Sequence, residues 1–495
     1  MRHALVAALI LLAAAWAPGT AVAATVRVTT SAELTAALAA AAPGTTIVLA
    51  AGAYAPVTIG GRSGGPASDI SLTGEPGATI AGMSITGGQR IAVSNLAIKP
   101  AGAPALVSVA SSSAISFTGV HLDGGAGGAG ASFELDDSAS GVLIANSTFL
   151  HCTSPYCIKA AGPGVVIQGN TFDSLDDTDA VHGFGSGTIR GNHMDHALPH
   201  GNGNHNDFIQ IGGGGPWTID ANWFGVRTNG AASIWLDPIN GGLIHDVVIS
   251  NNIVTGHYTG QYVGIFIGGD GTSAALLPRN VTLINNTVIS GLSNSLRFGQ
   301  NYASMPVDQR PLVVNNTGER LVGMCGRIRT SHNVFAVGDA CSPTDVIGNP
   351  HLDANGAPTA ASALLINRGD PSAPALDFYG YARVGAPDIG AIEFGGTPGV
   401  VAPPKVHAKP RLVAVKLRRG VRTLLVRVRT ANSTRFTVTV LRKGRILAKA
   451  AHPGSARHGI AIGFAAPRHG VLTVRVRAYG PGGAVVRLIA VKARP

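Results

Sequence analysis

Asparagine closes a short apolar segment at regular intervals along this chain. The segments include "VVIQGN", "WTIDAN" and "VTLINN", and they recur every 22 to 34 residues. Their last residues are Asn95, Asn146, Asn170, Asn192, Asn222, Asn252, Asn286 and Asn316, with Val120 at the place between the first two. A period of this length with one short β segment per repeat predicts a solenoid. A fixed asparagine predicts a turn in which its side chain bonds the backbone, tolerates a left-handed φ and stacks on the next coil.

The repeat has no leucine-rich consensus, which leaves a parallel β-helix as the predicted solenoid. Its first coil needs a cap, and the segment from Ser31 predicts a short Ala/Leu helix that stops at Pro43 and Gly44. In "SAELTAALAAAAPGTTIVLAAGAY", the asparagine-marked coils and "GAPDIGAIEFG", the chain resembles the right-handed parallel β-helix superfamily, which includes pectate lyases and polygalacturonases. The resemblance covers about residues 25–396 and implies an all-β fold, while the superfamily's activities include lyases, hydrolases, epimerases and non-catalytic adhesins.

Charge divides the chain into two parts. Residues 403–495 contain 21 Lys and Arg and no Asp or Glu, whereas the whole chain has 37 basic and 26 acidic residues, so the remainder is net acidic. Alternating segments such as "RTLLVRVRT" predict a small basic β-sandwich at 411–495, joined by a Gly/Pro-rich linker at 397–410 to the β-helix at 24–396. Such a surface suits an anionic cell-envelope polymer or acidic polysaccharide, and a solvated spacer is the alternative. We expect no nucleic-acid partner, because interleaved aromatic residues are lacking.

The N-terminal residues 1–23 predict an export signal, with a basic start, an apolar run too short to span a bilayer and a small-residue "AVA" site. We therefore expect a secreted or cell-surface monomer with no membrane span after the signal is removed. Its four cysteines fit that compartment. The sequence-local pairings, one of three combinations, are Cys152 with Cys157 and Cys325 with Cys341.

A second column of residues precedes the asparagine segments. In "CIKA", "AVHG", "FIQI" and "SIWL" an apolar residue is followed by a polar or aromatic one, and alternation along a strand predicts that the follower faces solvent. The outward row reads Ser108, Glu134, Lys159, His182, Gln210, Trp235, Phe266 and Arg297. Neighbours in the row are expected about 4.8 Å apart. Aromatic and hydrogen-bonding groups mixed in this way are typical of a sugar-binding groove, with a plain solvent face as the alternative. The substrate-binding residues we predict are Glu134, Gln210, Trp235, Asp237, Phe266 and Arg297.

Acidic and histidine residues gather in "LDDTDAVHG" and "NHNDFIQ", which feed neighbouring strands of this column. Asp179 and Asp207 hold equivalent places before their strands. The same two coils also hold Asp176, Asp177, His193, Asp195, His196, His200 and His205. Each Asp alone fits a turn cap, whereas the set as a whole indicates a functional site.

A lyase is the function we predict for this cluster. It would remove the proton α to a uronate carboxylate, with Lys159 or His182 as the general base. Some β-helix pectate lyases are similar in having an Asp-rich calcium site and a lysine base. The Ca²⁺ ligands we predict are Asp176, Asp177 and Asp179. The catalytic residues we predict are Lys159, His182, His205 and Asp207.

Two other functions stay open. A polygalacturonase-like hydrolase would use two carboxylates, and "DD", "VHG" and "GRIRT" resemble polygalacturonase elements but in the wrong order and spacing. A non-catalytic surface solenoid would bind glycan along Trp235 and Phe266. A transition-metal site is not favoured, because no HExxH-type spacing is present. The sequence thus predicts an exported carbohydrate-active protein, with a lyase acting on acidic glycan ahead of adhesion and hydrolysis.

Overall fold

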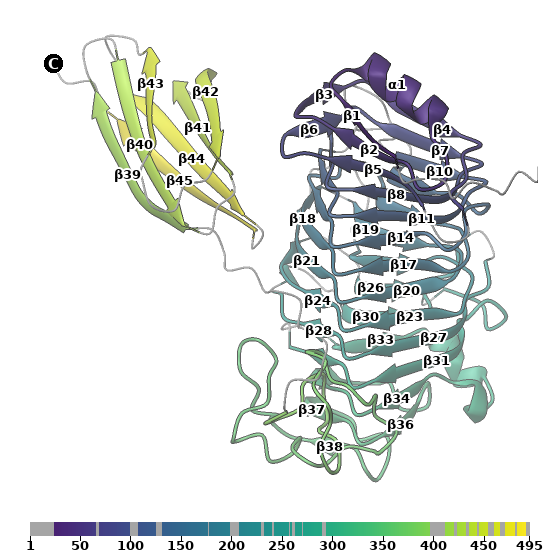
Figure 1. The fold of residues 1–495 in the computed structure, drawn as a ribbon. Coiled ribbons are helices and arrows are strands. Elements are labelled where there is room, and N and C mark those ends of the chain that lie inside the picture. Colours follow the sequence, from purple (N-terminus) through teal and green to yellow (C-terminus); the bar gives the residue numbers. More distant parts are fainter. Residues whose placement is uncertain are drawn as a thin grey trace, which may run out of the picture.

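The structure is a computed structural model in which β-strands dominate (Figure 1). It describes residues 24–396 except 66–68, 100–106, 125–130, 177, 199–206, 229–231, 240–241, 257, 260–262, 270 and 290–293, and residues 411–491 except 420–422, 432–434, 443–444, 454–459, 466–470 and 481–482. The expected signal segment and linker lie outside the described residues. In the described part, no helix has the length and apolar character to cross a bilayer.

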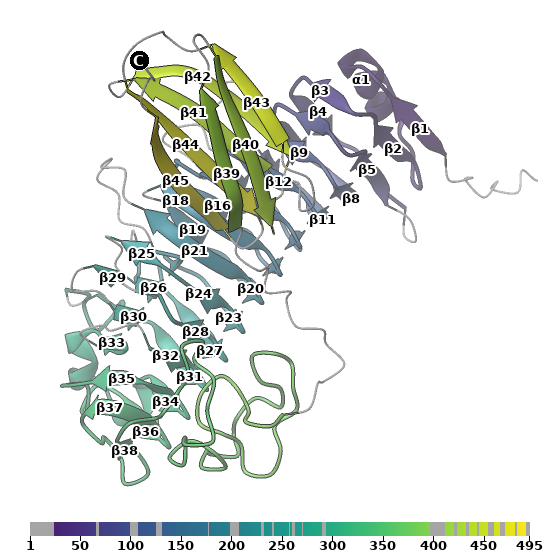
Figure 2. The same ribbon diagram turned by 90° about the vertical axis from the view of Figure 1, so that its left-hand side faces the viewer.

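Residues 24–396 coil into a solenoid walled by three long parallel sheets, and Figure 2 shows the strands stacked along its axis. The thirteen-stranded sheet runs β1 (Thr25–Val28), β2 (Thr46–Leu49), β5 (Ile70–Gly74), β8 (Gln89–Ser94), β11 (Ser113–Thr118), β14 (Leu143–Ala145), β17 (Val165–Gln168), β20 (Gly187–Arg190), β23 (Trp217–Asp220), β27 (His245–Ser250), β31 (Arg279–Ile284), β34 (Leu312–Val314) and β36 (Arg329–Ser331). The ten-stranded sheet runs β33 (Leu296–Phe298), β30 (Val263–Ile267), β26 (Ala232–Leu236), β22 (Ile209–Ile211), β19 (Asp179–Gly183), β16 (Tyr156–Ala160), β13 (Ala131–Leu135), β10 (Val107–Ala110), β7 (Met83–Thr86) and β4 (Val57–Gly60). The fifteen-stranded sheet runs β3 (Gly52–Tyr54), β6 (Ala78–Ile80), β9 (Ala97–Ile98), β12 (His121–Asp123), β15 (Thr148–Leu150), β18 (Thr171–Asp176), β21 (His193–Leu198), β24 (Trp223–Phe224), β28 (Ile253–Val254), β32 (Thr287–Val288), β35 (Thr317–Leu321), β37 (Val334–Gly338) and β38 (Val346–Ile347), with β25 (Arg227–Thr228) and β29 (Tyr258–Thr259) beside it.

The core is the space that the three sheets enclose. Strands such as β17 bury every second side chain, here Val165 and Ile167, which is the alternation expected of a pleated strand with one face inward. Aromatic rings stack from coil to coil inside, with Phe149 and Phe172 parallel and 4.9 Å apart between centroids. Burying each such ring contributes about 1.5–3 kcal/mol to stability. The repeated inward residues therefore hold neighbouring coils together.

The asparagines form a buried ladder at the turn between the thirteen-stranded and fifteen-stranded sheets. Oδ1 of Asn192 accepts hydrogen bonds from the backbone N–H and the Nδ2 of Asn170, both at 3.0 Å, and Nδ2 of Asn192 donates to the carbonyl of Ile167. The pattern repeats at Asn222, Asn252, Asn286, Asn316 and Asn333. Each side chain thus satisfies buried backbone groups that the turn takes out of the sheets.

Two of the predicted ladder positions are wrong. Asn95 and Asn146 lie one residue earlier in the turn, with φ of 54° and 50°, and Ser147 takes the ladder position, where its N–H donates to Asn170 Oδ1. Left-handed φ and coil-to-coil stacking therefore belong to two adjacent residues. The alignment merged them because both places favour asparagine, one for its tolerance of φ > 0 and the other for its paired donor and acceptor.

Asn222→Ala is expected to destabilise the solenoid by about 2–4 kcal/mol, because it leaves the Asn192 N–H and the Ile189 carbonyl buried without their partner. The midpoint of urea unfolding measures the loss. Asn355 is the matched control, since it is exposed and its side chain makes no hydrogen bond to any residue that the structure describes. Asn355→Ala should change stability by less than about 0.5 kcal/mol, and equal effects from the two variants would refute the ladder's role.

The ends of the solenoid are covered. Helix α1 (Ser31–Ala40) lies over the first coil with Leu34 and Leu38 buried, and Thr30 caps it by accepting the N–H of Glu33 at 3.2 Å. This confirms the predicted helical cap. The 3₁₀ helices η1 (Gln300–Ser304) and η2 (Val307–Gln309) follow β33.

An irregular segment, residues 348–396, packs back over the turns of the last coils (Figure 1). Asn315 and Asp370 exchange hydrogen bonds, with Nδ2 of Asn315 donating to the Asp370 carbonyl and the Asp370 N–H donating to Asn315 Oδ1. Nδ2 of Asn285 donates to the carbonyl of Asp388. The segment therefore closes the edge that the final turns would otherwise expose.

Residues 411–491 form two antiparallel sheets, as the alternating basic segments predicted. The three-stranded sheet runs β39 (Arg411–Arg419), β40 (Thr423–Ala431) and β43 (Ile460–Ala465), and the four-stranded sheet runs β42 (Arg445–Pro453), β41 (Arg435–Arg442), β44 (Leu472–Gly480) and β45 (Gly483–Val491). Val426 and Val428 are buried while Arg427 between them is exposed. Apolar residues thus form a core, and Arg427, Arg442, Arg445 and Arg475 face solvent.

Candidate functional site

The outward row predicted from the sequence exists on the ten-stranded sheet. The paired residues are Ser108 with Glu134, Glu134 with Lys159, Lys159 with His182, His182 with Gln210, Gln210 with Trp235, Trp235 with Phe266, and Phe266 with Arg297. Each member thus lies beside the next, one coil further along. The register is set by the buried residue before each member, because a shift of one residue would turn the apolar set outward.

The prediction that the whole row faces solvent is wrong for its middle. His182 is 1% exposed and Gln210 is 3% exposed. The ring of His182 lies 4.3 Å from that of Tyr156 and 4.7 Å from that of Phe184, and its Nε2 lies against Gly212. Tyr156 of the preceding coil and Phe184 of the same coil therefore cover His182, and only the two ends of the row are open.

Asp179 holds His182 in place. Its Oδ2 lies 2.8 Å from Nδ1 of His182, and its Oδ1 accepts the N–H of Asp207 at 2.9 Å. Burial raises the pKa of Asp179, and the hydrogen bond to His182 opposes that rise. The hydrogen bond between Asp179 and His182 therefore joins two buried side chains. Nε2 of His182 is buried, and no hydrogen-bond partner is found for it within the described ranges.

Asp207 takes the equivalent place on the next coil, as predicted. Its Oδ1 accepts the N–H of Ala232 at 2.5 Å, just as Asp179 accepts that of Asp207. Both carboxylates are buried and bond the backbone of the following coil. This is the turn-capping role that the sequence left open for each aspartate.

Lys159 and Glu134 form an ion pair, with Nζ and Oε1 2.8 Å apart and side chains 33% and 35% exposed. They are the accessible charged groups nearest to the His182 and Asp179 pair in the row. Tyr156, three residues before Lys159, packs on His182, and burial raises the pKa of its hydroxyl, with the charge of Asp179 adding to the rise. The phenol therefore stays protonated at neutral pH.

Trp235, Phe266 and Arg297 form a flat platform at the far end of the row. The two rings are parallel within 6° and 5.6 Å apart, and the guanidinium of Arg297 lies 5.0 Å over Phe266. Asp237 lies beyond Trp235, where its Oδ1 accepts from the N–H of Gly269 and from Thr272, both at 3.3 Å. All three platform side chains are partly exposed, so they present stacked surface to a ligand.

Comparison with known proteins gives a fold likeness. No family model matches the chain, and no curated protein is significantly similar to it. Similar solved structures include the PL6 family alginate lyase AlyGC, at 15% identity and a TM-score of 0.42 over 71% of this chain and 60% of that one. Others are an alginate lyase from Paenibacillus sp. str. FPU-7 (13%, 0.40, 56% of this chain and 98% of that one) and the catalytic domain of a GH87 α-1,3-glucanase in complex with nigerose (13%, 0.37, 66% and 68%).

The chain folds as a parallel β-helix. The sequence-local disulfides are present in this β-helix, joining Cys152 to Cys157 and Cys325 to Cys341. The disulfide of Cys152 with Cys157 closes the short loop that leads into β16, and Cys157 lies on that strand between Tyr156 and Lys159.

The described part of the β-helix does not assemble the predicted calcium site. No group of three or more Asp, Glu, His or Cys side chains within the described ranges is placed to hold a metal ion. Asp176 ends β18, and both carboxylate oxygens of Asp179 already accept protein hydrogen bonds or face His182. Asp177 and His205 lie outside the described residues. Calcium binding therefore stays a prediction.

Sequence reasoning missed Tyr156 and Phe184, whose rings enclose His182. Tyr156 begins strand β16 and Phe184 follows the end of β19, so neither belongs to the aligned outward row. Their position inside "SPYC" and "HGFG", at the rims of the same two strands, was the available signal. Side chains at strand ends can lean over the sheet, and the rule that side chains alternate along a strand does not predict their direction.

Proposed function

We propose that the β-helix binds an acidic polysaccharide along its outward row and cleaves it by β-elimination. The observation that supports this is the unbroken register from Glu134 to Arg297, which brings the Lys159 amine, a buried acid–imidazole pair and an aromatic platform onto one face. Sugar sites combine such a platform with a few convergent polar groups.

Binding would begin on the platform. The parallel rings of Trp235 and Phe266 offer apolar surface to the faces of successive sugars, and Arg297 offers a planar cation to a uronate carboxylate. Lys159, five coils from Arg297, is the other partly exposed cation of the row. A polysaccharide lying along the row would therefore meet positive groups at both ends.

Elimination would follow at Lys159. Its neutral amine removes the proton α to the carboxylate, the electron pair forms a carbon–carbon double bond, and the glycosidic carbon–oxygen bond breaks. The leaving oxygen takes a proton, and we assign its donation to the hydroxyl of Tyr156, which stays protonated because burial raises its pKa. Asp179 and His182 act as positioning residues that hold the ring of Tyr156.

Ultraviolet absorbance of the unsaturated uronate tests this function. The full chain is incubated with pectate, alginate and glycosaminoglycans, with and without Ca²⁺, and reducing ends are measured in parallel. An absorbance rise supports elimination, and its dependence on Ca²⁺ tests the metal prediction separately. Reducing ends without absorbance would instead indicate hydrolysis. The absence of both signals would overturn the enzymatic proposal.

Glycan binding without catalysis is the second candidate, and the ion pair of Lys159 with Glu134 favours it. The amine of Lys159 is held by a carboxylate 2.8 Å away, which is a structural contact that a binding surface can keep intact. Under this candidate the panel glycans bind and remain intact. An enzyme would instead release unsaturated or reducing ends from them.

Trp235→Ala is expected to weaken glycan binding about tenfold, because it removes the larger ring of the platform. Isothermal titration with a uronate oligosaccharide measures the change. Trp223 is the matched control, since it is partly exposed on the fifteen-stranded sheet and stacks on His193 instead. Unchanged affinity in Trp235→Ala would remove the platform from the proposed site.

We further propose that the protein is exported and that its C-terminal sheets attach it to an anionic polymer. Arg427 and Arg475 face solvent on different sheets, and the segment 403–495 carries no acidic residue. Attachment of this kind weakens as salt rises, because counterions screen the charge. Co-sedimentation with cell-envelope polymer across a salt series tests it, with the chain ending at residue 396 as the comparison.

A further inference from the structure

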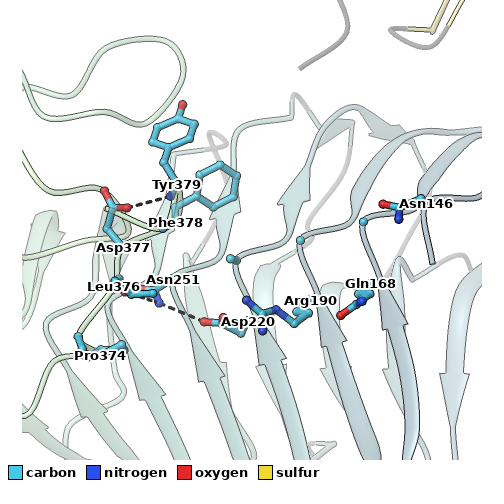
Figure 3. Close-up of a pocket in the computed structure, with 15 residues that line it drawn as sticks. Asn146, Gln168, Arg190, Asp220, Asn251, Pro374, Leu376, Asp377, Phe378 and Tyr379 are labelled. Atoms are coloured by element: carbon cyan, nitrogen blue, oxygen red, sulfur yellow. Dashed lines mark hydrogen bonds between the residues drawn. The ribbon is translucent and has the colours of Figure 1, made fainter. Parts of the chain in front are cut away.

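A second cavity lies on another face of the β-helix, along the ends of strands β17, β20 and β23 of the thirteen-stranded sheet. It has a volume of about 570 Å³. Its floor is the polar row Asn146, Gln168, Arg190 and Asp220, and its wall is the segment Pro374 to Gly380. Figure 3 shows the rings of Phe378 and Tyr379 on one side of the cavity and Arg190 and Gln168 on the other.

The wall is held rigidly in place. Buried Asp377 accepts the N–H groups of Tyr379 at 2.9 Å and Tyr381 at 2.7 Å. Nδ2 of Asn251 donates to the carbonyl of Leu376 at 3.2 Å and to Asp220 at 3.0 Å, which joins the wall to the floor. The cavity is therefore built by the fold and does not depend on a ligand to form.

The floor offers polar groups that the protein leaves unused. Within the described ranges, the guanidinium of Arg190 and the amide of Gln168 make no hydrogen bond or ion pair, although Asp220 is the strand neighbour of Arg190. Asp220 is engaged by Ser250 at 2.7 Å. Gly191 at φ 60° carries no side chain, and a Cβ there would meet nothing closer than 3.9 Å, so the floor beside Arg190 is open.

The wall is apolar where the floor is polar. Leu376 is 40% exposed and Tyr379 is partly exposed, while Phe378 packs beneath them with Ile253. A sugar has the matching shape, with an apolar ring face and a rim of hydroxyls that need donors and acceptors. Arg190 can donate to adjacent hydroxyls, and Gln168 can donate and accept.

We propose that this cavity is a second, non-catalytic binding site for a short glycan segment. The sugar's apolar face lies on Tyr379 and Leu376, and its hydroxyls or a carboxylate are bound by Arg190 and Gln168. The inference rests on the proposed action on glycans, but it concerns a separate face and separate residues. A glycan engaged at both sites would stay bound while its cleaved end leaves the outward row.

The test is binding stoichiometry by isothermal titration of the full chain with a uronate hexasaccharide and, separately, a neutral glucan hexasaccharide. The second arm tells hydroxyl recognition from carboxylate recognition. Two sites per chain are expected for at least one of the two sugars. Arg190→Ala and Tyr379→Ala each weaken one of these sites about tenfold or more, and Trp235→Ala weakens the other. Arg279→Ala is the control, since Arg279 is exposed at the start of β31 outside the cavity.

Each outcome decides one proposal or both. A single site lost only in Trp235→Ala overturns the second site and keeps the outward row. A single site lost only in Arg190→Ala and Tyr379→Ala supports the second site and overturns the row as the main glycan site. Equal weakening by Arg279→Ala, or no binding of either sugar, overturns the second site.

Discussion

Lys159→Ala is expected to lower the rate of uronate elimination by about 10²-fold or more, because the base that removes the α proton is gone. About a third of each side chain in the ion pair of Lys159 with Glu134 is exposed to solvent. Losing this pair should therefore lower stability by no more than about 1 kcal/mol. Ultraviolet absorbance and circular dichroism together separate lost activity from lost fold. Lys99→Ala is the control, since Lys99 is exposed and follows β9 outside the row.

Glu134→Gln sharpens the same test. The variant removes the carboxylate that holds Nζ of Lys159 at 2.8 Å and leaves the amine itself in place. If Lys159 is the base, Glu134→Gln keeps measurable elimination whereas Lys159→Ala loses it. An active Lys159→Ala would exclude Lys159 and favour another group of the row.

Arg383→Ala is expected to destabilise the β-helix by about 3–5 kcal/mol, because it leaves the buried carboxylate of Glu393 without its cation. The two side chains are 5% and 3% exposed and 3.2 Å apart. Arg383 also donates to Oδ1 of Asn251 and to the carbonyl of Gly390. The variant should therefore loosen the segment 348–396 from the last coils.

Urea unfolding and limited proteolysis measure this effect. Glu393→Gln should cost a similar amount, since it leaves Arg383 charged in a buried place. Arg27→Ala is the matched control, because its pair with Glu75 is 56% and 37% exposed and such surface pairs contribute little to stability. Equal losses in Arg383→Ala and Arg27→Ala would show that the segment is held by its other hydrogen bonds.

The register of the outward row was predictable because it depends on two local rules. Side chains alternate along a strand, and the apolar residue before each row member must point inward. From Glu134 to Arg297, every neighbour in the predicted row is a neighbour in the sheet. The pairing of Lys159 with Glu134 was available from the same alignment, since opposite charges on adjacent coils lie within reach.

Burial in the middle of the row was not predictable from alternation. His182 points away from the core, yet Tyr156, Phe184 and the close backbone at Gly212 cover it. These three come from different coils and from strand ends, where side chains lean over their neighbours. The role of Asp179 followed from the same packing, because its hydrogen bond to His182 exists only in the folded chain.

The amino-acid sequence by itself determined the parallel β-helix solenoid, its helical cap, the basic C-terminal sheets and the order of residues along the outward row. These features are set by short-range periodicity, and the same pattern recurs in successive segments of the chain. Only the tertiary structure decided which side chains are open, which carboxylates cap the next coil, and where the segment 348–396 forms a cavity with Arg190. Those properties depend on contacts between side chains that are far apart in the sequence, and a local sequence pattern does not predict such contacts.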